Sequence, residues 1–267
     1  MIAESDVTMD PRLRRLGARL LRQGALYDRL ARAPRSEETI HRLRVLTRRM
    51  RAACTLARRI APAPALRDLA RGLRKTGRAL GERRALDVAA ADYAFLSGGK
   101  THPLIERARI VAETKLLRRL RPRDREAVVA ATRGAARAMG SAEAEPGALE
   151  RFLRRRKERL RNASGAVTKE ELHVLRIEAK KTRYALEAAR VMTGGRAAPA
   201  ERTLKRLQRQ LGRIHDLEVL RALLPARDPV AVRAAAQEAS LRNGVRPLAN
   251  ALNSVALVPR GRNGRTP

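Results

Sequence analysis

Apolar residues recur every three or four positions along nearly the whole chain, and this spacing restricts its fold more than any other feature. It is typical of helices with one apolar face. Alternation with a period of two, flanked by hairpin turns, would predict strands and is not found. The sequence therefore predicts an all-α fold. The expected helices cover residues 11–32, 36–60, 63–83, 85–95, 103–120, 122–139, 147–162, 168–193, 199–213, 216–224 and 228–242.

Residues that start or stop helices lie at these limits. Ser36 and Thr168 are of the type that caps a helix N-terminus, and Pro64 and Pro122 suit the first turn. The Thr-Gly-Gly sequence at 193–195 predicts a helix end.

Two sequence blocks recur in the same order, which indicates an internal duplication. Residues 40–54 (IHRLRVLTRRMRAAC) align with residues 172–186 (LHVLRIEAKKTRYAL), a shift of 132. Residues 73–88 align with residues 204–219 at a shift of 131. A duplication predicts two pseudo-symmetric helical bundles related by a two-fold axis.

The joint between the bundles is expected at residues 140–147 (GSAEAEPG), the most acidic stretch rich in glycine and proline. One bundle would then cover residues 8–140 and the other residues 146–250. Residues 253–267 are polar and aperiodic and contain LVPRG, which resembles a protease-cleavage linker. They are expected to form a disordered tail outside the fold.

Basic side chains form a row along one helix of each repeat. His173, Arg176, Lys180 and Arg183 lie within roughly 80° of arc on a helix, and residues 41–51 repeat the pattern. Like charges at this spacing repel by about 0.2–0.5 kcal/mol per pair, which a bound anion would offset. The candidate anion-binding residues are His41, Arg44, Arg48, Arg49, Arg51, Arg74, Lys75 and Arg78 in the first repeat and His173, Arg176, Lys180, Lys181, Arg183, Lys205, Arg206 and Arg209 in the second.

Apolar residues flank the row on both sides, with Leu175 and Ala179 on one side and Tyr184 on the other. We expect these flanks to pack inside the bundle, so that the basic row lines a shared central groove. A single arginine-rich face is most often solvated surface. Here position and sign are repeated in two successive helices of both repeats, which favours a binding site.

The net charge is +33, from 60 Lys and Arg against 27 Asp and Glu. Such a charge calls for a polyanionic partner, which could be nucleic acid, an anionic membrane or an inorganic polyanion. Aromatic residues make up only 2% of the chain, and there is no tryptophan. The chain therefore has few side chains on which the bases of single-stranded nucleic acid could stack.

No catalytic residue, metal ligand or cofactor is expected, and the chain is interpreted as a non-enzyme. Its four histidines lack metal-ligand spacing, and the basic rows hold no carboxylate cluster for Mg²⁺. The sequence SGGKT at 97–101 is not a phosphate-binding P-loop, because Ala94 stands where glycine is required. His102 and Pro103 instead mark the next helix start.

No apolar run is long enough for a membrane span or a signal-peptide core. A soluble, cytoplasmic protein is expected, and its oligomeric state is left open.

Histidine becomes cationic near pH 6.5, so His41 and His173 predict tighter anion binding as the pH falls from 8 to 6. The alternative role for these histidines is a hydrogen bond within helix packing.

The motif H-x-L-R-(x)3-[RK]-[RK]-x-R, followed by a basic helix with L-G-(x)3-D-L, resembles the CHAD domain, the conserved histidine α-helical domain. The resemblance covers nearly all of residues 8–243. It implies two four-helix bundles around a basic channel that binds inorganic polyphosphate, and localisation at polyphosphate granules. It also implies that the residues of the basic rows bind polyphosphate. Non-specific nucleic-acid binding or a scaffold role is the alternative.

One position departs from the motif. The first repeat has Ala85 where the second has Asp216, so a carboxylate that could orient arginines is missing from the first repeat. Asp216 has two interpretations, an arginine-orienting carboxylate or the N-cap of a helix beginning near Leu217.

Overall fold

The computed structural model describes residues 10–34, 36–166, 168–195 and 199–253. In these ranges every regular element is an α-helix, which confirms the all-α prediction. The helices are α1 (Pro11–Arg32), α2 (Glu37–Ile60), α3 (Pro64–Ser97), α4 (Pro103–Arg119), α5 (Pro122–Gly140), α6 (Ala148–Asn162), α7 (Lys169–Thr193), α8 (Pro199–Leu223), α9 (Pro229–Asn243) and α10 (Val245–Asn253).

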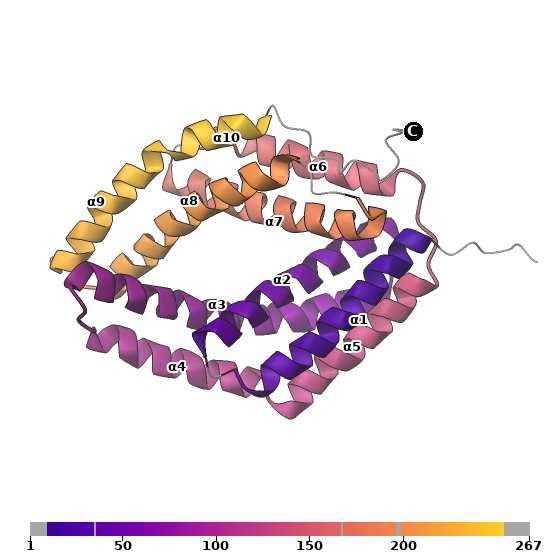
Figure 1. The fold of residues 1–267 in the computed structure, drawn as a ribbon, viewed down its shortest axis with the longest axis horizontal. Helices are drawn as coiled ribbons and strands as arrows, with labels where there is room; N and C mark the ends of the chain where they lie inside the picture. The colour runs from indigo at the N-terminus through magenta and orange to yellow at the C-terminus, as the bar shows by residue number, and fades with distance from the viewer. Residues whose placement is uncertain (1–9, 35, 167, 196–198, 254–267) are drawn as a thin grey trace, which may run out of the picture.

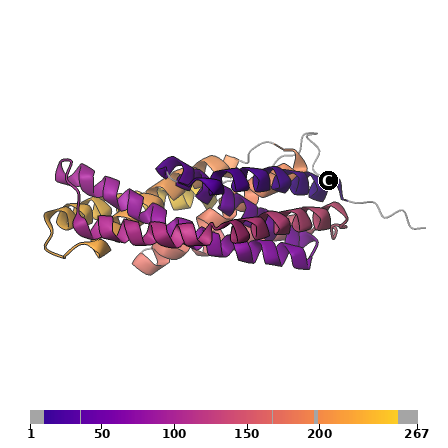
Figure 2. The ribbon, with the colours of Figure 1, turned by 90° about the horizontal axis from the view of Figure 1, so that it is seen from below.

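Helices α2 and α3 lie opposite α7 and α8 across the middle of the molecule (Figure 1). Helices α1 and α5 close one end, and the first turns of α4 and α9 lie at the other. Figure 2 shows that the body is elongated and shallow when turned by 90°. Helix α2 contacts α7, and α3 contacts α8. Ion pairs cross both contacts, Arg49 with Glu187 at 2.6 Å and Arg213 with Asp92 at 2.5 Å.

The helix limits predicted from capping residues, prolines and the Thr-Gly-Gly sequence are confirmed. The side chains of Ser36 and Thr168 accept the backbone N–H three residues along, and Thr168 completes a capping box. Pro64 and Pro122 lie in the first turns of α3 and α5. Helix α7 ends at Thr193, and Gly194 caps it with a φ of 65°, a conformation that glycine adopts without strain.

The residues around the glycine-rich stretch at 97–101 form the turn between α3 and α4. His102 caps α4, because its Nδ1 accepts the backbone N–H of Leu104 at 3.3 Å. The prediction of a helix start at His102 is therefore confirmed.

Two predicted helix breaks are wrong. Residues 63–83 and 85–95 belong to the single helix α3, and residues 199–213 and 216–224 to the single helix α8. Glycine in a helix interior costs only about 1 kcal/mol, so Gly81 and Gly212 do not end these helices. No proline interrupts either one.

Helix α10 was not predicted. Its buried residues Val245, Ala249 and Leu252 follow helical spacing, and Pro247 stands in the first turn, where proline is tolerated. The predicted disordered tail, residues 253–267, begins at the last residue of this helix, and residues 254–267 lie outside the described part of the chain.

One large apolar cluster runs through both predicted halves, with Leu16 on α1, Met50 on α2, Leu69 on α3 and Leu175 on α7 among its members. A smaller cluster joins α3, α4, α8 and α9 at the other end. The large cluster fixes α2, α3, α7 and α8, which carry the basic rows, in a rigid frame.

Helices α1 and α5 approach closely at Gly24, where an added Cβ would lie 2.7 Å from Thr132 Cγ2. We expect Gly24→Ala to destabilise the protein by about 1–3 kcal/mol because the contact overpacks the interface. Adding Thr132→Ser, which removes only the methyl group, should recover most of the lost stability. The measurement is urea denaturation followed by circular dichroism.

Gly134→Ala on α5 is the matched control, because an added Cβ there meets only Ala65 Cβ at 3.8 Å. It should leave stability unchanged or raise it, since alanine favours helix over glycine. Equal destabilisation by both alanine variants would contradict this packing.

Candidate anion-binding site

The apolar flanks of the basic row on α7 are packed inside the fold. Leu175 and Ala179 have no exposed surface, and Tyr184 is 7% exposed. The flanks therefore hold α7 in place as predicted, and Arg176 and Lys180 lie between them, half-buried.

Four basic side chains converge where α2 meets α7, and we call Arg44, Arg48, Arg176 and Lys180 the central cluster. Burial, then Arg48, lowers the pKa of Arg44 to about 10, and Arg176 acts in the same direction from the opposite helix. Burial also lowers the pKa of Arg176, with Asp216 opposing it. The fold thus brings together cations from both predicted repeats.

Lys180 is the most perturbed member of the central cluster. Burial, followed by the charges of Arg176, Arg48 and Arg44, lowers its pKa to about 6. Its amine is therefore mostly uncharged at neutral pH when the site is empty. An anion nearby would favour the charged form, so anion binding and protonation of Lys180 are coupled.

Buried nitrogen atoms in the central cluster have unused hydrogen-bonding capacity. In the described part of the chain, the Nε atoms of Arg44 and Arg176 are buried without a hydrogen-bond partner. A buried donor without an acceptor costs free energy. Oxygen atoms of a bound anion would supply the missing acceptors.

Asp216 lies inside α8, so its interpretation as an N-cap is wrong. Burial raises its pKa, while Arg176, Lys180 and Arg44 oppose that effect. The carboxylate is therefore close to three members of the central cluster, as an orienting role requires.

Three of the predicted residues already have partners within the protein. Arg49 pairs with Glu187, and Lys181 pairs with Glu178 at 2.8 Å. The Nε of Arg183 donates to Gln208 at 2.7 Å. The contacts of Arg49 and Arg183 join neighbouring helices, whereas the pair of Lys181 with Glu178 lies within α7. All three side chains have fewer free donors for an anion than the central cluster.

A second basic group lies between α2 and α3. Burial, then Arg74, Arg48 and Arg78, lowers the pKa of Arg51, so charges on the two helices lie close together. Lys75 is exposed beside them.

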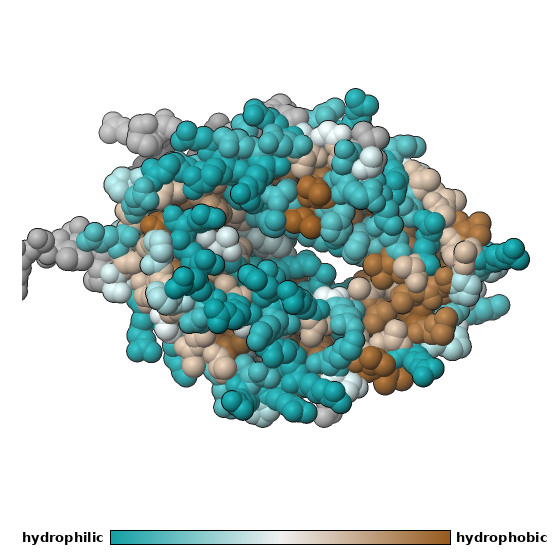
Figure 3. Space-filling model, turned by 180° about the vertical axis from the view of Figure 1, so that it is seen from behind, coloured by the Kyte–Doolittle hydropathy of each residue, from teal (hydrophilic) through white to brown (hydrophobic). Residues whose placement is uncertain are grey.

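On α8, Lys205, Arg206 and Arg209 are exposed. Lys205 and Arg209 share a helix face with Asp216 by their spacing. Figure 3 shows a hollow at the middle of the molecule with hydrophilic residues over most of its rim.

The histidines on α2, α7 and α8 have different surroundings. Burial, then Arg84, lowers the pKa of His41, so it is mostly neutral at pH 7. The ring of His173 lies 6.2 Å from that of His215. Burial, then Arg176 and Lys180, lowers the pKa of His215 to about 4. His215 was missed because it fell in the predicted break between two helices, which hid its position on α8.

The described residues hold no group of three or more His, Cys, Asp or Glu that could bind a metal ion. None of the helices in that part of the chain is long and apolar enough to cross a membrane.

No curated protein matches this sequence. Two solved structures share the fold, each at 20% sequence identity. The CHAD domain from the plant Ricinus communis has a TM-score of 0.69, and the match covers 94% of this chain and 95% of that one. PptA from Streptomyces chartreusis has a TM-score of 0.61, and the match covers 91% of this chain and 98% of that one. The family model of the CHAD domain matches residues 13–225. CHAD domains are generally binding domains without catalytic activity. The match spans well over half of the sequence, and the chain belongs to the CHAD domain family.

Proposed function

We propose that this protein binds inorganic polyphosphate in a basic central groove, acts at polyphosphate granules and catalyses no reaction. The observation that carries the proposal is the central cluster, where four basic side chains meet with Asp216 as the neighbouring carboxylate. Family membership supports it, because polyphosphate binding is a general property of CHAD domains.

The chemistry of the central cluster suits a phosphate chain. A guanidinium group stays ionised and donates two parallel hydrogen bonds to phosphate oxygens. Polyphosphate carries about one charge per phosphate and has no bases to stack, so charge density matters more than aromatic surface. The basic groups of α2–α3 and α8 would extend the site for a longer chain.

The proposed duplication explains how one chain builds such a groove. The repeated helices α2 and α7 contact each other, as do α3 and α8. A pseudo-two-fold axis between the repeats would place equivalent basic rows on both sides of one groove. The contact pattern supports this arrangement.

We expect Arg44→Gln combined with Arg176→Gln to weaken binding of long-chain polyphosphate at least about a hundredfold. Each substitution removes charge-assisted hydrogen bonds worth about 1.5–3 kcal/mol. Isothermal titration calorimetry measures the loss, and circular dichroism checks the helix content. Arg74→Gln combined with Arg78→Gln, both exposed, should also weaken binding.

The matched control is Arg154→Gln combined with Arg155→Gln, two exposed arginines on α6 outside the basic rows. It removes the same net charge and should change the affinity only slightly. Equal losses in the control and in the Arg44 and Arg176 variant would argue against the assigned site.

Lys180 should make polyphosphate binding tighter as the pH falls from 8 toward 6, because binding drives protonation of an amine whose pKa is about 6 in the empty site. Calorimetry at pH 7 in buffers of different ionisation enthalpy should detect proton uptake. Lys180→Met should lose most of this uptake and bind more weakly.

The same variant should stabilise the empty protein. The pKa of Lys180 is about 6 in the folded state, compared with the usual 10.5. Between pH 6 and pH 10.5 the unfolded state therefore binds more protons than the folded state, so the stability of the folded protein falls as the pH decreases. Lys180→Met removes this penalty and should raise the melting temperature, more at pH 6 than at pH 9. A lower melting temperature together with unchanged proton uptake would contradict the role of Lys180.

A further inference from the structure

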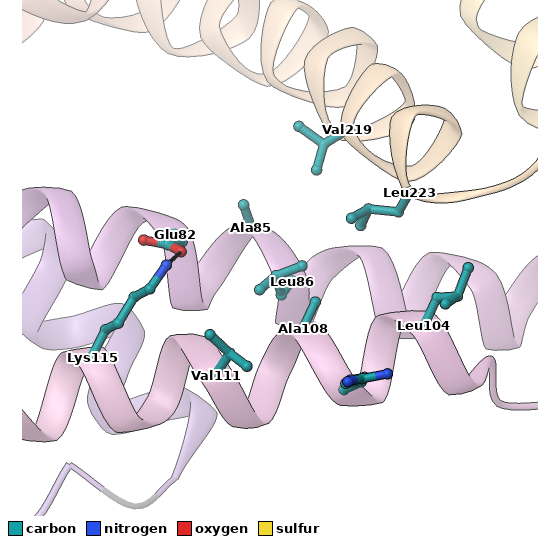
Figure 4. Close-up of a pocket in the computed structure, with 10 residues that line it drawn as sticks. Glu82, Ala85, Leu86, Leu104, Ala108, Val111, Lys115, Val219 and Leu223 are labelled. Atoms are coloured by element: carbon teal, nitrogen blue, oxygen red, sulfur yellow. Dashed lines mark hydrogen bonds and ion pairs between the residues drawn. The ribbon is translucent and has the colours of Figure 1, made fainter.

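An open apolar groove of about 550 Å³ lies between α3, α4 and α8, apart from the central cluster (Figure 4). Its apolar lining comes from all three helices. These residues are Ala85 and Leu86 on α3, Leu104 and Val111 on α4, and Val219 and Leu223 on α8.

Helix α4 leaves much of its apolar surface uncovered. Its main neighbour is α3, and its residues Ile105 and Leu116 are buried. On its other faces Leu104 is 52% exposed and Ile110 is 66% exposed. A helix with apolar residues on several faces is normally covered on all of them.

Exposed apolar residues gather on this part of the surface. In Figure 3 they form a patch at the end of the molecule where α4 and α9 begin and α8 ends. Val111 on α4 and Val232 on α9 are 50% and 60% exposed. A contiguous patch beside a groove is typical of a surface that binds another protein.

The charges at the groove indicate the chemistry of its occupant. Arg107 lines it and is exposed. Glu82, the acidic residue of the lining, is neutralised by Lys115 at 2.8 Å. With a net charge of +33, a second copy of this chain would be repelled, whereas an acidic partner would be attracted.

We propose that the groove between α3, α4 and α8 binds an amphipathic helix of an acidic protein partner. Apolar residues at positions i, i+3 or i+4 and i+7 of that helix would contact Leu104, Val111 and Leu223. Its acidic residues would face Arg107. Leu104 and Val111 are two turns apart, about 10 Å, so two turns of the partner suffice to span them. The site is independent of polyphosphate binding.

Selection of a displayed library of helical peptides against the full chain tests this proposal. The enriched peptides should carry apolar residues at helical spacing and a net negative charge. Fluorescence anisotropy with one synthesised peptide should show at least about tenfold weaker binding to Leu104→Asp and to Val111→Asp. Arg107→Glu should weaken binding several-fold.

The matched control is Leu21→Asp, which changes a leucine of similar exposure (45%) on α1, at the opposite end of the molecule. It should bind the peptide normally, and Leu104→Asp should bind polyphosphate as the unmodified chain does. A failure of the polyphosphate proposal would leave these peptide results unchanged.

Three results would overturn the inference. One is that selection enriches no peptide, or enriches peptides that bind Leu104→Asp equally well. Another is that the enriched peptides are neutral or basic. The last is sedimentation showing self-association of the chain that Leu104→Asp abolishes, which would make a second copy the occupant.

Discussion

Repulsion among half-buried cations is the constraint on which the rest of the structure depends. Arg44 and Arg48 on α2 meet Arg176 and Lys180 on α7, and burial and mutual repulsion lower the pKa of Lys180 to about 6. Such an arrangement costs stability unless other contacts hold the helices together or an anion is bound. The large apolar cluster and the ion pair between Arg49 and Glu187 supply those contacts. These contacts hold the four basic side chains close together despite their repulsion.

The two predicted repeats differ where they meet. In the second, α8 carries Asp216 beside the central cluster, whereas α3 carries Ala85 at the equivalent position. Ala85 lines the apolar groove instead. The aligned positions therefore differ in character, with an apolar residue on α3 and a carboxylate on α8.

Helical periodicity and capping residues were enough to predict the fold class and most helix limits, because Ser36, Thr168 and Pro122 act through local geometry. The spacing of basic residues also identified the central cluster. The sequence did not predict that α3 and α8 are each one continuous helix. Both contain a glycine, whose low helix propensity is weak enough for tertiary packing to override. The pairing of Arg49 with Glu187 and the perturbation of Lys180 depend on contacts between distant segments. No local pattern in the sequence encodes these contacts.

Calorimetric titration with long-chain polyphosphate at about 150 mM salt, with duplex DNA and tripolyphosphate as comparators, tests the central claim most directly. A groove built for a phosphate chain predicts tight, saturable binding of polyphosphate and much weaker binding of DNA. Comparable weak binding of both polymers, lost when salt is added, would contradict it. The basic rows would then be a general positive surface.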